Sequence, residues 1–179
     1  MHPQMQKILL TEEQIQSRIH QMAREISGDY AGQEPLLVGI LKGAFIFLAD
    51  LARSLTIPVK LDFIAISSYG GASESSGAVR VLKDLDQSIK DLPVLLVEDI
   101  VDTGLTVNYL KENLLARGPA SLKVCALLDK PSRRLVEVKL DYNGFTIPDE
   151  FVVGYGLDYN GKYRHFKDIM ILKREVYTR

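Results

Sequence analysis

The stretch "LLVEDIVDTGLTVNYLKENL", from Leu95 to Leu114, decides the fold of this chain. The apolar run Val94–Glu98 predicts a strand buried on both faces, because such strands are almost continuously hydrophobic. Val107–Arg117 predicts a helix, since its apolar residues recur on one face. Three carboxylates lie close together where the strand is expected to end: Glu98, Asp99 and Asp102. A strand made only for the core does not need them, so the stretch indicates a strand, a chemically active loop and a helix.

The rest of the chain alternates between helical and strand periods. This alternation predicts an α/β fold with a mostly parallel central sheet flanked by helices. Two further helices are expected, at 44–55 and at Thr11–Ser27, where Thr11 and Gln14 have the spacing of a capping box. The further strands are expected at Pro35–Leu41, Val59–Tyr69, 78–85, 121–129, 151–156 and 169–177.

The length and composition are those of one ordinary globular domain, residues 1–179. The net charge of −1 gives no reason to expect a nucleic-acid or membrane partner. The apolar run Ile8–Leu10 is too short for a signal peptide, and no stretch approaches the ~18 apolar residues of a membrane span. The single cysteine, Cys125, lies in an apolar run and is expected to be a buried structural residue. We therefore expect a cytoplasmic protein.

The residues between strand and helix, Asp102–Thr106, have the chemistry of a phosphate cradle. Backbone N–H groups at a helix start lack partners and carry partial positive charge. Gly104 lets the backbone approach a ligand closely, and Thr103 and Thr106 add hydroxyl donors. The paired acids Glu98-Asp99 suit sugar hydroxyls or Mg²⁺, provided that the strand ends there and both reach one ligand. The alternative is that Thr106 only caps the helix and that the acids are solvated.

"VLLVEDIVDTGLT" resembles the phosphoribosyl pyrophosphate (PRPP) signature of the type I phosphoribosyltransferases: an apolar run, two acids and a loop ending in Thr-Gly-x-Thr. "VGILKGAF", "SSYGGASESSG", "LLDKPSRR" and "FVVGYGLDYNGKYR" resemble, in the same order, segments of the hypoxanthine-guanine phosphoribosyltransferases. The resemblance implies the type I phosphoribosyltransferase fold, with a small hood built from the chain ends and a flexible lid loop. It implies purine salvage: a 5-phosphoribosyl group moves from PRPP to hypoxanthine or guanine, giving IMP or GMP and pyrophosphate, with Mg²⁺ as cofactor. It also implies a homodimer or homotetramer.

The resemblance assigns roles to the acids and the loop. It implies that Glu98 and Asp99 hold the ribose hydroxyls and Mg²⁺, and that Asp102 exchanges a proton with the purine N7. The 5′-phosphate would be held by five consecutive residues: Asp102, Thr103, Gly104, Leu105 and Thr106.

For the leaving pyrophosphate, the resemblance implies a grip from three parts of the chain. Lys42-Gly43 would bind through backbone amides, with the peptide bond between them in cis, and Arg164 would add its guanidinium. Ser68 and Tyr69 would contact the pyrophosphate when the lid, Ser67–Gly77, closes and excludes water. Without the resemblance these residues suggest only a turn, a surface arginine and a flexible linker.

For the purine, the resemblance implies that Lys130 donates to O6 and so selects against a 6-amino base. Phe151 would stack on the purine, and the backbone of Val152 would bind its edge. Asp158 would border the purine site and be a ligand of a second Mg²⁺ that carries pyrophosphate. The plainer alternatives are an exposed lysine for Lys130 and a core aromatic residue for Phe151.

Two other functions remain open on the same residues. A non-catalytic regulator could keep the PRPP signature, and an enzyme of this family could prefer xanthine. A generic Rossmann-like nucleotide binder ranks last, because GxGxxG is missing. The segment after Arg164 departs from the family pattern, so His165 has no assigned role and is expected to be exposed. The pair Arg133-Arg134 is expected to lie on the surface.

Overall fold

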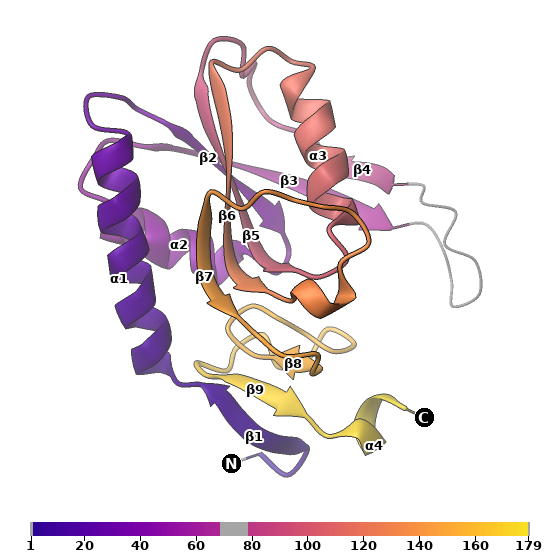
Figure 1. Ribbon diagram of the computed structural model, residues 1–179. Helices are drawn as coiled ribbons and strands as arrows, with labels where there is room; N and C mark the ends of the chain where they lie inside the picture. The colour runs from indigo at the N-terminus through magenta and orange to yellow at the C-terminus, as the bar shows by residue number, and fades with distance from the viewer. Residues whose placement is uncertain (1, 69–78, 179) are drawn as a thin grey trace.

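The protein is described by a computed structural model that covers residues 2–68 and 79–178. Its main sheet has the strand order β4-β3-β2-β5-β6-β7 (Figure 1). Four neighbouring pairs in this sheet are parallel, and β4 pairs with β3 in the antiparallel sense. The strands are β2 (Leu36–Leu41), β3 (Lys60–Ser68), β4 (Val79–Lys83), β5 (Pro93–Val101), β6 (Ser121–Asp129) and β7 (Tyr142–Thr146). The predicted α/β fold with a mostly parallel sheet is therefore confirmed.

Helices cover both faces of this sheet. Helix α1 (Glu12–Asp29) and helix α2 (Phe45–Ser54) pack on one face, and α3 (Leu105–Leu115) packs on the other (Figure 1). The alternation of side chains along β5 divides its residues between the two cores. Leu95 and Val97 pack with α1 and α2, whereas Val94 and Leu96 pack with α3.

The first helix begins as its sequence predicts. The Thr11 side chain accepts a hydrogen bond from the Gln14 backbone N–H at 3.3 Å, and the Gln14 side chain accepts one from the Thr11 backbone N–H at 2.9 Å. This reciprocal capping box satisfies two backbone donors that a helix start leaves free.

A second, smaller sheet has the order β1-β9-β8 and joins both ends of the chain. It consists of β1 (Met5–Leu10), β9 (Ile169–Leu172) and β8 (Val152–Val153), and the short helix α4 (Arg174–Tyr177) follows β9. Figure 1 shows this hood below the carboxyl ends of the main strands, with both termini in it. The hood from the chain ends is thus present as expected.

Four details of the sequence interpretation were wrong. Strands β1 and β7 were not predicted, the strand expected at 151–156 is only Val152–Val153, and the one expected at 169–177 ends at Leu172. The strand expected at 151–156 stops early because Gly154 and Gly156 both have φ of +98°. Glycine adopts this conformation freely, and it lies outside the strand region. The lid loop and Tyr69 lie outside the described residues, since the description resumes at Val79.

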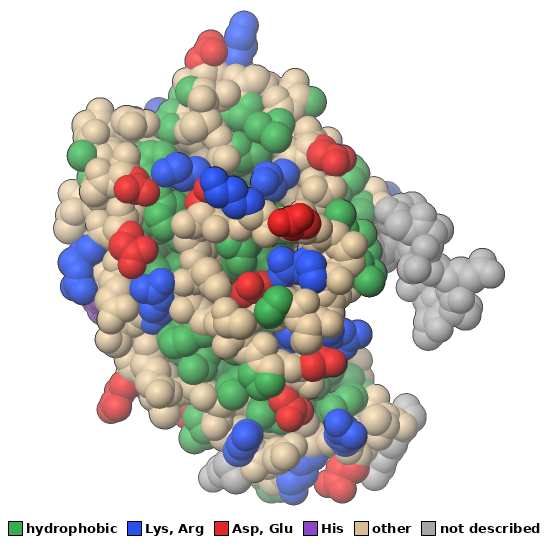
Figure 2. Space-filling view, viewed as in Figure 1, with side chains coloured by type: hydrophobic (Ala, Val, Ile, Leu, Met, Phe, Trp, Pro, Cys, Tyr) green, Lys and Arg blue, Asp and Glu red, His purple; other side chains and the backbone are tan. Residues whose placement is uncertain are grey.

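The surface and the core agree with the composition. On the face shown in Figure 2, basic and acidic side chains are interspersed, as the net charge of −1 suggests. Cys125 is buried in β6, as predicted. Within the described residues, no helix combines the length and the apolar character needed to cross a membrane.

Candidate active site

The acids of β5 lie inside the strand and not beyond its end. β5 continues to Val101, so the expectation that the strand stops at Glu98 was wrong. The alternation of side chains changes at the two acids: Ile100 packs with the α1 and α2 core and Val101 with the α3 core, and the Glu98 and Asp99 carboxyl groups stay in contact. Glu98 lies on the α3 side and lines a small hollow there, whereas Asp99 lines a larger hollow beside Lys130 and Asp158.

The two carboxyl groups are held in a poorly solvated place. Glu98 is 5% exposed, and burial raises its pKa well above the usual 4.5, with the neighbouring Asp99 carboxylate adding to the effect. Burial also raises the pKa of Asp99, while its contact with Glu98 and the charge of Arg164 act in the opposite direction. A cation, or the hydroxyl groups of a sugar, would therefore be bound here by carboxyl groups that are shielded from water.

The start of α3 leaves backbone donors free for an anion. Its N-cap is Gly104, with φ of +85° and no side-chain capping bond. Thr106 lies inside the helix, so the alternative that Thr106 caps it was wrong. A hollow of about 90 Å³ is lined by this helix start and the strand before it, including Glu98, Thr103, Gly104 and Thr106. Free N–H groups at a helix N-terminus, together with two hydroxyls, make this hollow suitable for a phosphate.

A second hollow, of about 290 Å³, lies under the hood. Its lining includes six of the predicted site residues: Asp99, Asp102, Lys130, Phe151, Val152 and Asp158. It shares Ile100 and Asp102 with the small hollow, so the two spaces meet at the end of β5. Asp102 Oδ1 is buried and has no hydrogen-bond partner, although the Arg133 guanidinium lies 3.6 Å from it. An unsatisfied carboxylate oxygen at such a junction is unfavourable unless a ligand supplies a donor.

Lys130 is a buried cation at the edge of the larger hollow. The residue is 5% exposed, and its Nζ donates a hydrogen bond to the Glu150 carbonyl oxygen at 2.9 Å. An ammonium group has three donors, so this bond fixes its direction while leaving it able to bind a carbonyl group of a ligand. Because Lys130 follows β6 directly, the end of that strand positions it.

The turn after β2 lies against Asp99. A Cβ on Gly43 would be 1.7 Å from Asp99 Oδ2, and a Cβ on Gly156 would be 2.2 Å from the Gly43 carbonyl oxygen. Only glycine at both positions allows this close approach. The cis peptide bond at this turn joins Leu41 to Lys42, one residue before the position expected from the sequence.

Arg164 and Asp158 form an ion pair close to the same turn. Arg164 Nη2 lies 2.7 Å from Asp158 Oδ1, and Arg164 Nη1 donates to the Gly156 carbonyl oxygen at 2.6 Å. Ser68 ends β3 at the same edge of the sheet. The predicted site residues of β2, β3, β5 and β6 thus lie at the carboxyl ends of these strands, which is where open α/β sheets bind ligands.

Comparisons with known proteins agree with this geometry. The family pattern described as phosphoribosyl transferase domain matches residues 5–160. The chain belongs to this phosphoribosyl transferase family. The hypoxanthine-guanine phosphoribosyltransferase of Mycobacterium avium is 51% identical over 176 residues, which cover 95% of this chain and 87% of that protein. The hypoxanthine phosphoribosyltransferase of Trypanosoma cruzi in complex with the product IMP is 47% identical, with a TM-score of 0.93 and 99% of both chains covered. The bifunctional protein TilS/HprT of Listeria monocytogenes is 46% identical over 99% of this chain, which spans 28% of that protein.

In this phosphoribosyl transferase, two arginines near the site were not predicted from the sequence. Arg134 is not a surface residue: its guanidinium pairs with Asp129 and donates to the Asp102 carbonyl oxygen at 3.1 Å. It thereby holds the loop that carries Asp102 against the end of β6. Arg133 lines the larger hollow, and 53% of its side chain is exposed, so it is the surface residue that the sequence predicted. The sequence signal was only their position shortly after Lys130, which does not say which of the two points inward.

The oxygen ligands of the site fit Mg²⁺. Among the described residues, no group of three or more His, Cys, Asp or Glu side chains lies close enough to hold a metal ion. Mg²⁺ is commonly held by one or two carboxylates together with substrate phosphates and water, so a larger cluster is not required. Asp99, with its raised pKa, and Asp158 both line the larger hollow of the phosphoribosyl transferase, and they are the candidates that a substrate-carried ion would meet. His165 is exposed and has no contact that indicates a role in the site.

Proposed function

We propose that this chain is a magnesium-dependent hypoxanthine-guanine phosphoribosyltransferase of purine salvage. It transfers the 5-phosphoribosyl group of PRPP to hypoxanthine or guanine and produces IMP or GMP with pyrophosphate. The observation that carries the proposal is the position of Asp102, which borders both a phosphate-sized hollow and a purine-sized hollow. A nucleoside monophosphate has its phosphate and its base at two ends of one molecule, so two joined hollows suit such a product.

On the phosphate side, the start of α3 binds the 5′-phosphate of PRPP. Its donors are the N–H groups of the helix start beyond Leu105 and the hydroxyls of Thr103 and Thr106, whereas the Leu105 N–H donates to the Thr103 hydroxyl oxygen at 3.4 Å. The ribose lies between the two hollows, where Glu98 lines the smaller and Asp99 the larger, so that both acids reach its hydroxyls. Buried carboxylates accept hydrogen bonds strongly, which fixes the sugar for attack at its anomeric carbon.

On the purine side, Lys130 donates to O6, Phe151 stacks on the ring, and the backbone of Val152 binds the ring edge. The purine N9 forms a bond to the anomeric carbon with inversion, and the bond to pyrophosphate breaks with its electron pair leaving on the pyrophosphate. Asp102 accepts the proton from N7 as the base becomes part of the nucleotide. The free oxygen Asp102 Oδ1 supports this role, because a base must have a lone pair available.

The leaving pyrophosphate is bound at the turn after β2. The backbone amides at Lys42-Gly43 and the guanidinium of Arg164 bind it, and the closeness of Gly43 to Asp99 supports one continuous site. Asp99 and Asp158 would hold Mg²⁺ together with PRPP, and the ion would supply neutralisation of charge on the leaving group. For this, Asp158 must exchange its contact with Arg164, so that the arginine and the carboxylate both turn to the ligand.

We further infer a cytoplasmic homodimer or homotetramer. A buried, unpaired Cys125 suits a reducing compartment, and large apolar residues exposed on the surface, such as Leu82 and Leu135, suit contact with a second copy. Light scattering of the purified protein would measure the number of copies.

The experiment that tests the enzyme proposal offers the purified protein Mg²⁺, PRPP and one purine at a time. Hypoxanthine, guanine, xanthine and adenine are supplied separately, and chromatography detects each nucleotide. IMP and GMP with little AMP are expected, and strong XMP formation would move the preference to xanthine. Binding of PRPP without any nucleotide product would overturn the enzyme proposal in favour of a regulator. Reactions without PRPP are the control.

A further inference from the structure

The Phe151 ring is packed from two directions by aromatic side chains of the hood. Tyr177 is stacked on it, with ring centroids 4.8 Å apart and an angle of 24° between the planes. Tyr159 meets it edge-on, with centroids 5.6 Å apart and an angle of 90°. Phe151 also lines the larger hollow under the hood. Its ring therefore separates Tyr177 from the space in which a purine would lie.

Tyr177 comes from α4, the last helix of the chain, which is attached to the hood through backbone bonds. The Leu172 N–H donates to the Phe151 carbonyl oxygen at 2.8 Å, and the Lys173 N–H donates to the Gln4 carbonyl oxygen at 3.0 Å. Val176 and Tyr177 also pack against a small apolar cluster of the hood. The chain at the start of α4 is thus hydrogen-bonded to the backbone of Phe151, and this bond fixes the position at which the Tyr177 ring meets the Phe151 ring.

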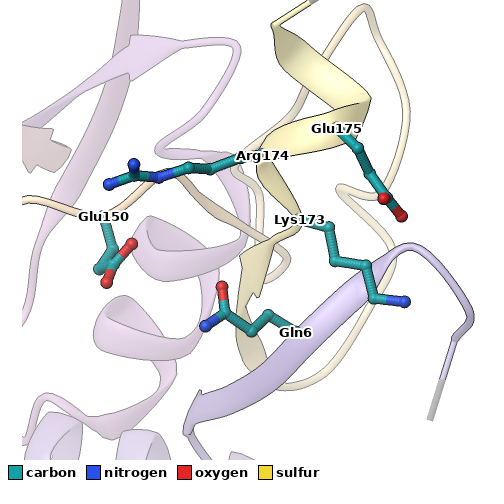
Figure 3. A pocket seen from close by; sticks show the side chains of 5 residues that line it. All are labelled: Gln6, Glu150, Lys173, Arg174 and Glu175. Carbon is teal, nitrogen blue, oxygen red and sulfur yellow. The ribbon is translucent and has the colours of Figure 1, made fainter.

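The polar side of α4 does not make this attachment. A hollow of about 430 Å³ separates the helix from the residues before Phe151, and its lining includes Gln6, Glu150, Arg174 and Glu175 (Figure 3). Figure 3 shows Arg174 extending across this hollow towards Glu150, while Glu175 points away from Glu150. The stacked rings are accordingly the packing contact between α4 and the purine-binding residue.

We propose that Tyr177 is a positioning residue, which holds the Phe151 ring in the orientation that receives the purine. The inference rests on the proposed function, because it concerns how tightly that function's purine is bound. A phenylalanine on a hollow can turn about its side-chain bonds when no base is present, and ordering it then reduces affinity. Tyr177 covers one face of the ring, and Phe151 also lines the larger hollow in which the base would lie.

The test is the affinity of the protein for IMP, measured by titration calorimetry, together with steady-state kinetics. In Tyr177→Ala, the Kd for IMP and the KM for hypoxanthine are expected to rise about 2- to 12-fold, the range that one aromatic pair contributes. The KM for PRPP should stay the same, because the start of α3 and the turn after β2 do not touch α4. Tyr177→Phe keeps the ring and should restore the wild-type values.

Val176→Ala is the matched control, since it removes packing from the neighbouring position of the same helix without removing a ring. It should leave the Kd for IMP unchanged. An equal loss in Val176→Ala and Tyr177→Ala, or an unchanged Kd in Tyr177→Ala, would overturn the positioning role. If the wild-type protein bound no IMP at all, the proposed function would fail and this inference with it. Thermal unfolding of each variant verifies that the hood remains folded.

Discussion

Substituting Gly43 by alanine should separate the turn after β2 from Asp99. The added Cβ would lie 1.7 Å from Asp99 Oδ2 and 2.6 Å from its Cγ. Carbon atoms of this kind are not found closer than 3.0 Å to another heavy atom, so the two groups must move apart by about 1.3 Å. A misplacement of about 1 Å in a site can reduce catalysis about 100-fold. We expect kcat/KM for PRPP to fall by about that factor in Gly43→Ala.

The assay is the formation of IMP from hypoxanthine at varied PRPP and Mg²⁺ concentrations. The overpacking should also lower the free energy of unfolding by roughly 1–3 kcal/mol, which urea denaturation measures. Gly28→Ala is the matched control, because a Cβ there meets nothing within 4 Å and the residue lies in α1. It should keep full activity and gain up to about 1 kcal/mol of stability from helix propensity. A fully active Gly43→Ala enzyme would refute the reasoning.

Three further predictions concern the carboxylates and Lys130. Asp102→Asn should bind PRPP nearly normally and lose about 10²- to 10⁴-fold in kcat, as expected when a proton acceptor is removed; unchanged turnover would exclude Asp102 from the proton transfer. Lys130→Gln should reduce kcat/KM for hypoxanthine about 10- to 100-fold, which is the value of a hydrogen bond from a charged donor. The ratio of kcat/KM for hypoxanthine to kcat/KM for adenine should also fall. An unchanged ratio in parallel assays would contradict the contact between Lys130 and O6. Burial raises the pKa of Glu98 in the folded chain, so this group keeps a proton that the unfolded chain releases above its usual value of 4.5. In Mg²⁺-free buffer the free energy of unfolding should therefore decrease as the pH rises from about 4.5 through the raised pKa, by up to about 1.4 kcal/mol per pH unit for this group. Glu98→Gln should make the decrease smaller in urea titrations at several pH values, and the part that remains is expected from Asp99, whose pKa burial also raises.

The fold was predictable where one stretch contains its own signal. Helix α1 has a capping box and an apolar stripe, and β5 is an apolar run, so both were found from local pattern. Strand β1 was not found, because its hydrogen-bond partner β9 lies at the other end of the chain. Strand β7 contains Asn143 and Gly144, which have low strand propensity, and it is formed by pairing with β6.

The site was predictable in its membership more than in its geometry. Motif order placed Asp102, Lys130 and Phe151 in one site, and the structure brings them to one hollow. The direction in which each side chain points depends on where a strand ends, and β5 continues past the acids. The same limit hid Arg134, whose contacts are with the ends of two strands that only the folded sheet brings together.

The pairing of β1 with β9 has a consequence for the order in which the protein is made. Met5 is paired with Leu172 and Leu10 with Ile169, so β1 leaves the ribosome long before its partner β9 is available for pairing. The main sheet has its strands complete by Thr146 and can form while the rest is still being synthesised. Val152–Val153 of β8 pairs with β9, so the wall that receives the purine is completed only after β9 has been synthesised. A nascent chain stalled before Ile169 should consequently hold the phosphate cradle without a place for the base.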